Sequence, residues 1–187
     1  MAERRLTKKP GSPLGGLIIP STLTGSRLKV EPDCWKQCCV AGLPWSIATR
    51  SREASTSLCA YDASFGAGLI EAMTQVVSWR KAVALIAYDQ PYPEPLHSAR
   101  PLLASFGAAL ILTHEATGRT SATFELELLP GEEKPARMSD SALEELRLGI
   151  PAARSLPLLE ALARNTQSHV VLDFLTETRL RVSVNPC

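Results

Sequence analysis

Residues 54–72 read ASTSLCAYDASFGAGLIEA and contain the transition on which the predicted fold depends. The first part, Ser55 to Ala60, is a short apolar and β-tolerant run that predicts a buried strand. Asp62 follows as a suitable helix N-cap, and apolar residues recur at helical spacing from Ala63 to Trp79. Because small or apolar residues occupy nearly all sides of this helix, we expect it to be buried. The stretch therefore predicts a buried strand that leads directly into a buried helix.

Two glycines, Gly66 and Gly68, lie inside the predicted helix. A glycine in a helix interior costs about 1 kcal/mol relative to alanine. Because the sequence carries that cost twice within three residues, we expect another backbone to pass very close to this part of the helix.

The chain after this helix alternates between further strands and helices. Ala82 to Tyr88 is a near-continuous apolar run, typical of a strand covered on both faces, and the prolines between Asp89 and Pro95 predict an extended loop after it. Further strands are predicted at Ala104–Thr113, Ala122–Leu129, His169–Phe174 and Arg179–Val184. Leu175–Thr178 could close the last two as a hairpin, and short helices are predicted at Ser141–Leu148 and Leu156–Arg164. The predicted fold class is α/β, a layered architecture in which a mixed sheet packs against helices.

Composition excludes several classes of protein. The chain has 187 residues and a net charge of +1, so no strong field recruits nucleic acid or an anionic membrane. No apolar stretch approaches the roughly 18 residues of a membrane span, and we expect a cytoplasmic protein. Residues 1–39 are rich in Gly, Pro, Ser, Thr and Lys without a sustained period, which predicts an irregular or disordered segment before a folded body at 40–187.

The five cysteines do not indicate a disulfide framework, because their number is odd and Cys38 and Cys39 are adjacent. Cys34, Cys38 and Cys39 have no nearby histidine, so their spacing does not favour zinc. The glycines of the 63–79 helix do not open it, and the sequence contains no phosphate-binding glycine loop. We therefore predict neither a metal nor a cofactor.

Cys59 is the one candidate nucleophile. It lies at the end of the predicted strand, just before a helix amino terminus, where free N–H groups and a partial positive charge stabilise a thiolate and an oxyanion. The alternative is that Cys59 is a small hydrophobic core residue, as buried cysteines commonly are. No spacing among His97, His114 and His169 predicts a Cys–His pair.

Several stretches resemble β-ketoacyl synthases. Ala54–Phe65 followed by Gly68–Ala72 resembles their nucleophile strand and helix, most closely in a bacterial group of β-ketoacyl-synthase-like amino-terminal proteins linked to aryl-polyene and related pigment pathways. The resemblance continues at Val83–Asp89, Arg100–Pro101, Phe106–Leu112 and Pro151–Leu159. It covers residues 40–187 and implies a partial thiolase-like layered fold, the amino-terminal half of a synthase.

The resemblance also implies a function. Cys59 falls where the family's acyl-accepting cysteine lies, so it would receive an acyl chain from acyl carrier protein as a thioester, as in a 3-oxoacyl-[acyl-carrier-protein] synthase. The family's two condensing histidines come from a carboxyl-terminal half that is not in this sequence, so we expect an incomplete site and a second synthase subunit or a homodimer. Tyr61 and Asp62 depart from the small hydroxyl residues usual after the nucleophile. Two alternatives remain: a non-catalytic partner like a chain-length factor, and a cysteine acyltransferase or thioesterase.

Overall fold

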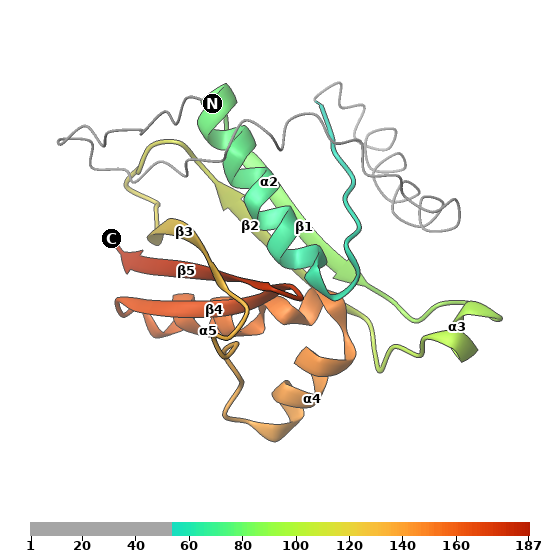
Figure 1. Cartoon of the computed structure of the whole chain (residues 1–187). Helices are drawn as coiled ribbons and strands as arrows, with labels where there is room; N and C mark the ends of the chain where they lie inside the picture. Colours follow the sequence, from blue (N-terminus) through green and yellow to red (C-terminus); the bar gives the residue numbers. More distant parts are fainter. Residues whose placement is uncertain (1–53) are drawn as a thin grey trace, which may run out of the picture.

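The computed structural model describes residues 54–187, so the predicted irregular segment 1–39 and the start of the folded body at residue 40 lie outside the described residues. The elements, with η for a 3₁₀ helix, are η2 (Tyr61–Ala63), α2 (Ser64–Trp79), β1 (Val83–Asp89), α3 (Leu96–Ala99), β2 (Phe106–Leu112), β3 (Ala122–Pro130), α4 (Ser141–Gly149), η3 (Pro151–Ser155), α5 (Leu156–Arg164), β4 (Ser168–Leu175) and β5 (Thr178–Pro186). Figure 1 shows α2 crossing the middle of this arrangement, with β1 and β2 on one side and β4 and β5 near its amino end.

The helix α2 confirms the prediction of a buried helix. Every residue from Ser64 to Val76 is buried or partly buried, and only the last turn is exposed. Gly66 confirms the expected close approach, because a Cβ at this position would lie 3.3 Å from the backbone oxygen of Asp173 in β4. Gly68 differs, since its nearest neighbour is the side chain of Leu85 at 3.1 Å rather than a backbone.

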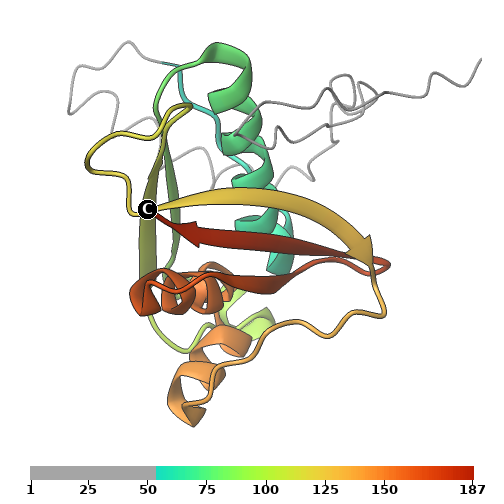
Figure 2. The same ribbon diagram turned by 90° about the vertical axis from the view of Figure 1, so that its left-hand side faces the viewer.

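The five strands form two antiparallel sheets. The first pairs β1 with β2, and the second has the order β3-β5-β4. A parallel pair needs a crossover of a dozen or more residues, usually helical, whereas β4 and β5 join through a two-residue turn and β1 returns into β2 after only the short α3. The α/β class is confirmed, but the expected mixed sheet is wrong for the described residues. Figure 2 shows the two sheets running in different directions, with the first sheet beside α2 and the second crossing both.

One hydrophobic core joins these elements. Its buried residues come from α2, α5, β4 and β5: Phe65, Leu69, Leu158, Ala161, Val170, Leu172, Leu180, Val182 and Val184. Leu85 and Leu110 pack against this cluster from the inner face of the first sheet. The amino end of α2 therefore packs against both sheets. This packing fixes the position of the helix end that follows the turn after Cys59.

The outer face of the first sheet is exposed, contrary to the expectation that β1 is covered on both faces. Burial alternates along β1 and β2, because only one face packs against the core. Ile86 is 56% exposed, Tyr88 is 46% exposed and Ile111 of β2 is 71% exposed. The apolar sequence of β1 is typical of a strand buried on both faces. Within residues 54–187, however, other elements cover only one face of this strand.

The predicted strand Ser55–Ala60 is not a strand in the structure. Residues 54–60 form an irregular extended segment whose first four residues are exposed. A strand needs a neighbouring strand to satisfy its backbone groups, and this segment instead runs back along α2, where Gln75 Nε2 donates to Thr56 Oγ1 at 3.3 Å. Figure 1 shows the segment lying beside α2 before it turns into the helix.

The remaining elements follow the sequence closely. Asp140, directly before the predicted helix Ser141–Leu148, caps α4 and accepts from the N–H groups of Ala142 and Leu143 at 3.0 and 2.9 Å. Pro157 lies in the first turn of α5, and β4 and β5 form the expected hairpin. No helix within residues 54–187 is long and apolar enough to cross a membrane.

Candidate functional site

Cys59 lies in the extended segment immediately before η2, and its side chain is only partly buried. Two residues later the chain enters η2, which continues without a break into α2. The sequence therefore places Cys59 correctly relative to the helix, although the strand on its other side is absent from the described residues. Whether this thiol reacts stays a prediction.

A tight turn follows Cys59. The N–H of Ala60 donates to Ser64 Oγ at 2.9 Å, and that hydroxyl donates to the carbonyl of Tyr61 at 2.6 Å. Tyr61 has a positive φ of 53°, a conformation that costs a residue with a Cβ about 1 kcal/mol or more. Backbone strain of this kind persists only where the surroundings impose it.

Arg100 contacts both residues of the strained turn. Its guanidinium carbon lies 4.8 Å from the centre of the Tyr61 ring, and its Nη2 is 2.5 Å from Asp62 Oδ1. A cation–π contact and an exposed ion pair each contribute on the order of 0.5–1 kcal/mol. Together they are comparable with the strain at Tyr61, so Arg100 can hold the turn in its observed conformation.

Asp62 is not the N-cap that the sequence predicts. It lies inside η2, and the helix α2 has no side-chain cap. The Asp62 carboxylate faces two arginines instead, with Arg154 Nη2 at 4.0 Å in addition to Arg100. The positive charges favour an ion pair with this carboxylate over a hydrogen bond to the helix N–H groups.

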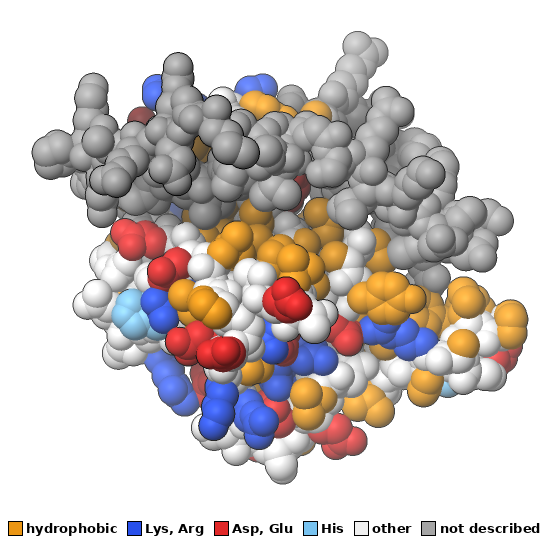
Figure 3. All heavy atoms as spheres, in the orientation of Figure 1, with side chains coloured by type: hydrophobic (Ala, Val, Ile, Leu, Met, Phe, Trp, Pro, Cys, Tyr) orange, Lys and Arg blue, Asp and Glu red, His pale blue; other side chains and the backbone are white. Residues whose placement is uncertain are grey.

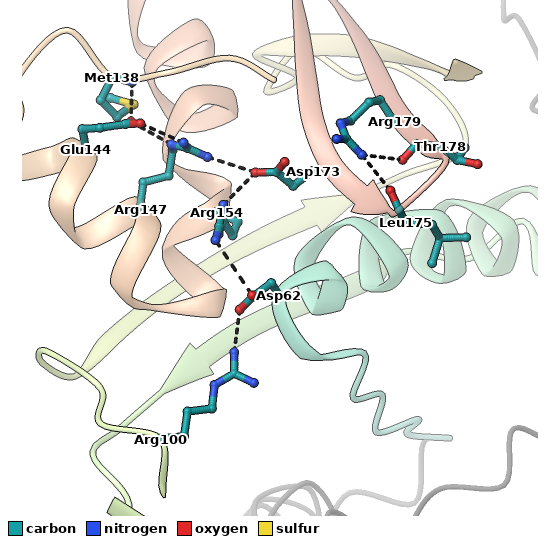
Figure 4. A network of polar contacts seen from close by, with 10 residues as sticks. All are labelled: Asp62, Arg100, Met138, Glu144, Arg147, Arg154, Asp173, Leu175, Thr178 and Arg179. Carbon is teal, nitrogen blue, oxygen red and sulfur yellow. Dashed lines mark hydrogen bonds and ion pairs between the residues drawn. The ribbon is translucent and has the colours of Figure 1, made fainter. Parts of the chain in front are cut away.

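The ion pairs extend from this turn into the molecule, as Figure 4 shows. Arg154 of η3 lies 2.7 Å from Asp173 Oδ2 of β4, and Arg147 of α4 approaches the same oxygen at 3.1 Å. Arg147 is buried and also donates to both oxygens of Glu144, at 2.7 and 2.8 Å. These hydrogen bonds lower the pKa of Glu144 to about 2. We call Glu144, Arg147, Asp173, Arg154, Asp62 and Arg100 the ion-pair chain.

Asp89 adds a second carboxylate close to Arg100. It ends β1 and accepts the N–H of Ala152 in η3 at 2.6 Å. Burial raises the pKa of Asp89, and the nearby charge of Asp62 adds to the rise, while the Ala152 hydrogen bond and Arg100 oppose it. Asp89 therefore joins the carboxyl end of β1 to η3, beside the turn that follows Cys59.

Sequence reasoning missed most of this arrangement. Arg100, Arg147, Arg154 and Asp173 are far apart in the chain, and nothing in their spacing indicates that they meet. Two local features pointed to residues of this region. Asp89 lies at the end of a predicted strand, and Arg100–Pro101 is one of the stretches that resemble β-ketoacyl synthases. The fold, rather than any motif, creates the ion-pair chain.

The three histidines lie on three separate parts of the fold. His97 is in α3, and its Nδ1 is buried without a hydrogen-bond partner among the described residues. His114 lines an open pocket of about 280 Å³ with Arg80, Lys81 and Thr117, where α2 and β2 end. His169 of β4 shares a hydrogen bond of 3.1 Å with Ser183 of β5.

The described residues contain no group of three or more His, Cys, Asp or Glu side chains placed to hold a metal ion. Cys34, Cys38 and Cys39, for which zinc is not favoured by spacing, lie outside residues 54–187. The groups described around Cys59 are its thiol, the paired charges of Asp62, Arg100 and Arg154, and the N–H groups at the start of η2.

Comparison with known proteins identifies the family. Residues 39–173 match the family described as β-ketoacyl synthase, N-terminal domain, and the match includes Cys59 and the whole ion-pair chain. No curated protein and no solved structure matches the chain. Because the match covers more than two thirds of the 187 residues, the chain belongs to the β-ketoacyl synthase N-terminal domain family.

Proposed function

We propose that this protein is a β-ketoacyl synthase-like acyltransferase of fatty-acid or polyketide type, and that Cys59 accepts an acyl chain from acyl carrier protein. The observation that carries the proposal is the position of Cys59, which lies within the family match and at the turn into a buried helix. Family membership makes acyl transfer the expected chemistry, and Cys59 is the one described cysteine at such a turn.

The proposed step is a thioester exchange. The sulfur of Cys59 forms a bond to the acyl carbonyl carbon, the bond from that carbon to the carrier sulfur breaks, and the Cys59 proton passes to the departing carrier thiolate. The transient oxyanion needs hydrogen-bond donors, and the first N–H groups of a helix supply such donors together with a partial positive charge. The N–H groups of Ala60, Ala63 and Ser64 already donate within this turn, so those of Tyr61 and Asp62, at the start of η2, are the candidate donors next to Cys59.

The condensation that follows acyl loading needs further groups, and we propose that a second synthase subunit or a second copy of the chain supplies them. The exposed apolar face of β1 and β2 supports this proposal, because Ile86, Tyr88 and Ile111 are large hydrophobic side chains exposed together on one sheet face. Contiguous apolar surface of this kind commonly marks a protein–protein contact.

A more specific proposal concerns the biosynthetic pathway to which the acyl groups belong. The stretch from Ala54 to Ala72 and the segment Pro151–Leu159 resemble the aryl-polyene and pigment group of β-ketoacyl-synthase-like proteins. We therefore propose that the acyl groups belong to an aryl-polyene or related pigment pathway, with an acyl carrier protein as the donor.

A non-catalytic role as a partner like a chain-length factor is the second candidate. It is favoured by Tyr61 and Asp62, because a bulky ring and a carboxylate follow Cys59 where small residues would leave more room. In this role Cys59 would only contribute to packing. Association with a full-length synthase, without acylation of Cys59, would support it.

One experiment tests the acyl-transfer proposal. The protein is mixed with acyl carrier protein that bears acetyl or longer acyl groups, and the cysteine peptides are analysed by mass spectrometry. We expect the added mass of the acyl group on the Cys59 peptide, and none in Cys59→Ala. Cys187→Ser is the matched control, because that thiol is exposed and distant in the chain, and its loss should leave acylation unchanged.

A further inference from the structure

We propose that Arg100 holds the turn Tyr61–Asp62 in the strained conformation that presents Cys59 for acyl transfer, so that Arg100 is a positioning residue of the acyl-accepting site. This inference rests on the proposed function of Cys59. It concerns a residue 41 positions away in sequence, which the fold brings to the turn.

The turn needs an external hold. Tyr61 has a φ of 53°, in the left-handed region that residues with a Cβ rarely adopt. The hydroxyl of Ser64 bonds to Ala60 and Tyr61 but contacts only the backbone of the turn. The Tyr61 ring and the Asp62 carboxylate point outward from η2, and both are exposed, so their conformation depends on the group they meet outside the turn.

Arg100 is that group. The same guanidinium lies over the Tyr61 ring, at 4.8 Å, and bonds the Asp62 carboxylate, at 2.5 Å. Two consecutive side chains are thus fixed by one planar cation, which restricts the backbone between them. A lysine keeps the charge but cannot offer the planar face and the fork of donors together.

The ion pairs that restrain the turn connect it to the second sheet. Asp62 also faces Arg154 at 4.0 Å, and Arg154 is bonded to Asp173 of β4 at 2.7 Å. Arg100 itself follows α3 and lies close enough to Asp89 for its charge to oppose the rise that burial causes in the pKa of that carboxyl. Figure 4 shows Arg100, Asp62, Arg154 and Asp173 in succession, from the loop to the sheet.

Loss of this hold should affect two reactions of Cys59 in opposite directions. Acyl transfer from a large carrier protein requires a fixed orientation of the sulfur, and a misplacement of about 1 Å can slow a reaction by about 100-fold. Alkylation by iodoacetamide requires only access to a partly buried thiol, and a loosened turn increases that access. Partial unfolding would also expose Cys59 and speed its alkylation, so the circular dichroism spectrum and urea midpoint of each variant must match those of the wild type under the assay conditions.

The test compares Arg100→Gln with the wild-type full chain. We expect the single-turnover rate constant for acylation of Cys59 to fall about tenfold, and alkylation of Cys59 to become several-fold faster relative to Cys187 in the same molecule. Arg100→Lys should restore part of the acylation rate. Tyr61→Ala, which keeps the strained φ but lacks the ring, should shift both rates in the same direction as Arg100→Gln, whereas Tyr61→Phe should resemble the wild type.

Arg181→Gln is the matched control. Arg181 pairs with Glu127 across β3 and β5 at 2.8 Å and its side chain is 33% exposed, the same fraction as Arg100. It should change neither rate. Unchanged alkylation of Cys59 in Arg100→Gln would overturn the inference, as would an equal effect of Arg181→Gln.

These outcomes separate the inference from the proposed function. If wild-type protein is not acylated, the proposed function fails, and the alkylation comparison still decides whether Arg100 holds the turn. If wild-type protein is acylated and Arg100→Gln is acylated at the same rate, the proposed function stands and the positioning role is contradicted.

Discussion

Asp173 shows how one residue can organise charges that are distant in sequence. Its Oδ2 accepts from Arg154 at 2.7 Å and from Arg147 at 3.1 Å, so one carboxylate oxygen joins η3 and α4 to β4. Arg147 is only 5% exposed at its side chain. Burying a guanidinium costs folding free energy unless carboxylates compensate its charge. Asp173 and Glu144 are therefore needed for the stability of the fold.

Asp173→Asn should therefore destabilise the protein strongly. The substitution keeps the shape of the side chain but removes the charge shared by Arg147 and Arg154, leaving both less compensated. We expect the free energy of unfolding to fall by about 2–4 kcal/mol, measured by urea denaturation. Glu160→Gln, which removes an exposed pair with Arg164, is the control and should cost less than about 0.5 kcal/mol. Equal losses in the two variants would contradict this role of Asp173.

At the scale of elements, α2 combines helix formation with a close approach to β4. A Cβ at Gly66 would lie 3.3 Å from the Asp173 backbone oxygen and 3.4 Å from the Phe174 ring. A Cβ at Gly68 would meet only the end of the Leu85 side chain, at 3.1 Å, which can rotate away. Two glycines that look equivalent in the sequence therefore have different roles.

Alanine substitutions should separate these roles. Gly68→Ala should gain up to about 1 kcal/mol of stability from helix propensity, reduced by the adjustment of Leu85. Gly66→Ala should lose about 1–2 kcal/mol, because a backbone oxygen cannot move as a side chain can. Thermal and urea unfolding of the two variants provide the measurement. A Gly66→Ala protein as stable as Gly68→Ala would show that β4 does not constrain the helix.

The helix α4 carries a pH-dependent contribution to stability. The pKa of Glu144 falls from its ordinary value of 4.5 to about 2, chiefly through the hydrogen bonds from Arg147. Because the folded pKa is lower than the unfolded pKa, this stabilisation is complete above about pH 4.5 and is lost as the pH falls towards 2. We expect the stability difference between the wild type and Glu144→Gln to shrink between pH 6 and pH 3. A difference that stays constant over this range would exclude Glu144 as the source.

At the scale of the whole molecule, the surface drawn in Figure 3 differs between the charged region and the region near α3. Figure 3 shows lysine, arginine, aspartate and glutamate side chains intermixed over the α4 and β4 region, and hydrophobic side chains gathered towards α3. Leu96 and Leu103 near α3 are 46% and 56% exposed, and Ile86 and Ile111 on the sheet are more than half exposed. This distribution supports a partner at the first sheet rather than at the charged side.

Ile111→Lys should reduce association with a second synthase subunit or a second copy. Ile111 is 71% exposed on β2, so the substitution leaves the core intact while placing a charge on the apolar face. We expect sedimentation velocity to show a smaller assembly than the wild type at the same concentration, with an unchanged circular dichroism spectrum. Leu128→Lys is the control, because Leu128 is 50% exposed on β3 of the other sheet, and it should leave association unchanged. An Ile111→Lys protein that assembles normally would place the partner elsewhere.

The sequence predicted the local parts of this fold well. Helical spacing placed α2 within one residue, and the alternation of apolar residues placed β3. The helix predicted at Ser141–Leu148 matches α4, and the strands predicted at His169–Phe174 and Arg179–Val184 fall within β4 and β5. The sequence could not predict which strands pair or whether a layer covers them. Hence the mixed sheet, the strand Ser55–Ala60 and the two-sided burial of β1 were wrong, since each depends on neighbours distant in sequence.

The candidate site was predictable only in its centre. The resemblance and the position before a helix made Cys59 the candidate, and its reactivity stays a prediction. The arginines around the following turn come from a loop and from η3, and nothing in the sequence indicated their contact with it. Even Asp62, assigned from local rules as a cap, is redirected by Arg100. Long-range ion pairs of this kind have no signal in periodicity or spacing.

Acyl transfer to Cys59 is the most direct test of this account. Carrier protein bearing an acyl group is incubated with the wild type and with Cys59→Ala, and every cysteine peptide is mapped by mass spectrometry. We predict the acyl mass on the Cys59 peptide of the wild type and unmodified peptides in the variant. Acylation of another cysteine, or no acylation of a folded wild-type protein by any acyl group offered, would contradict it.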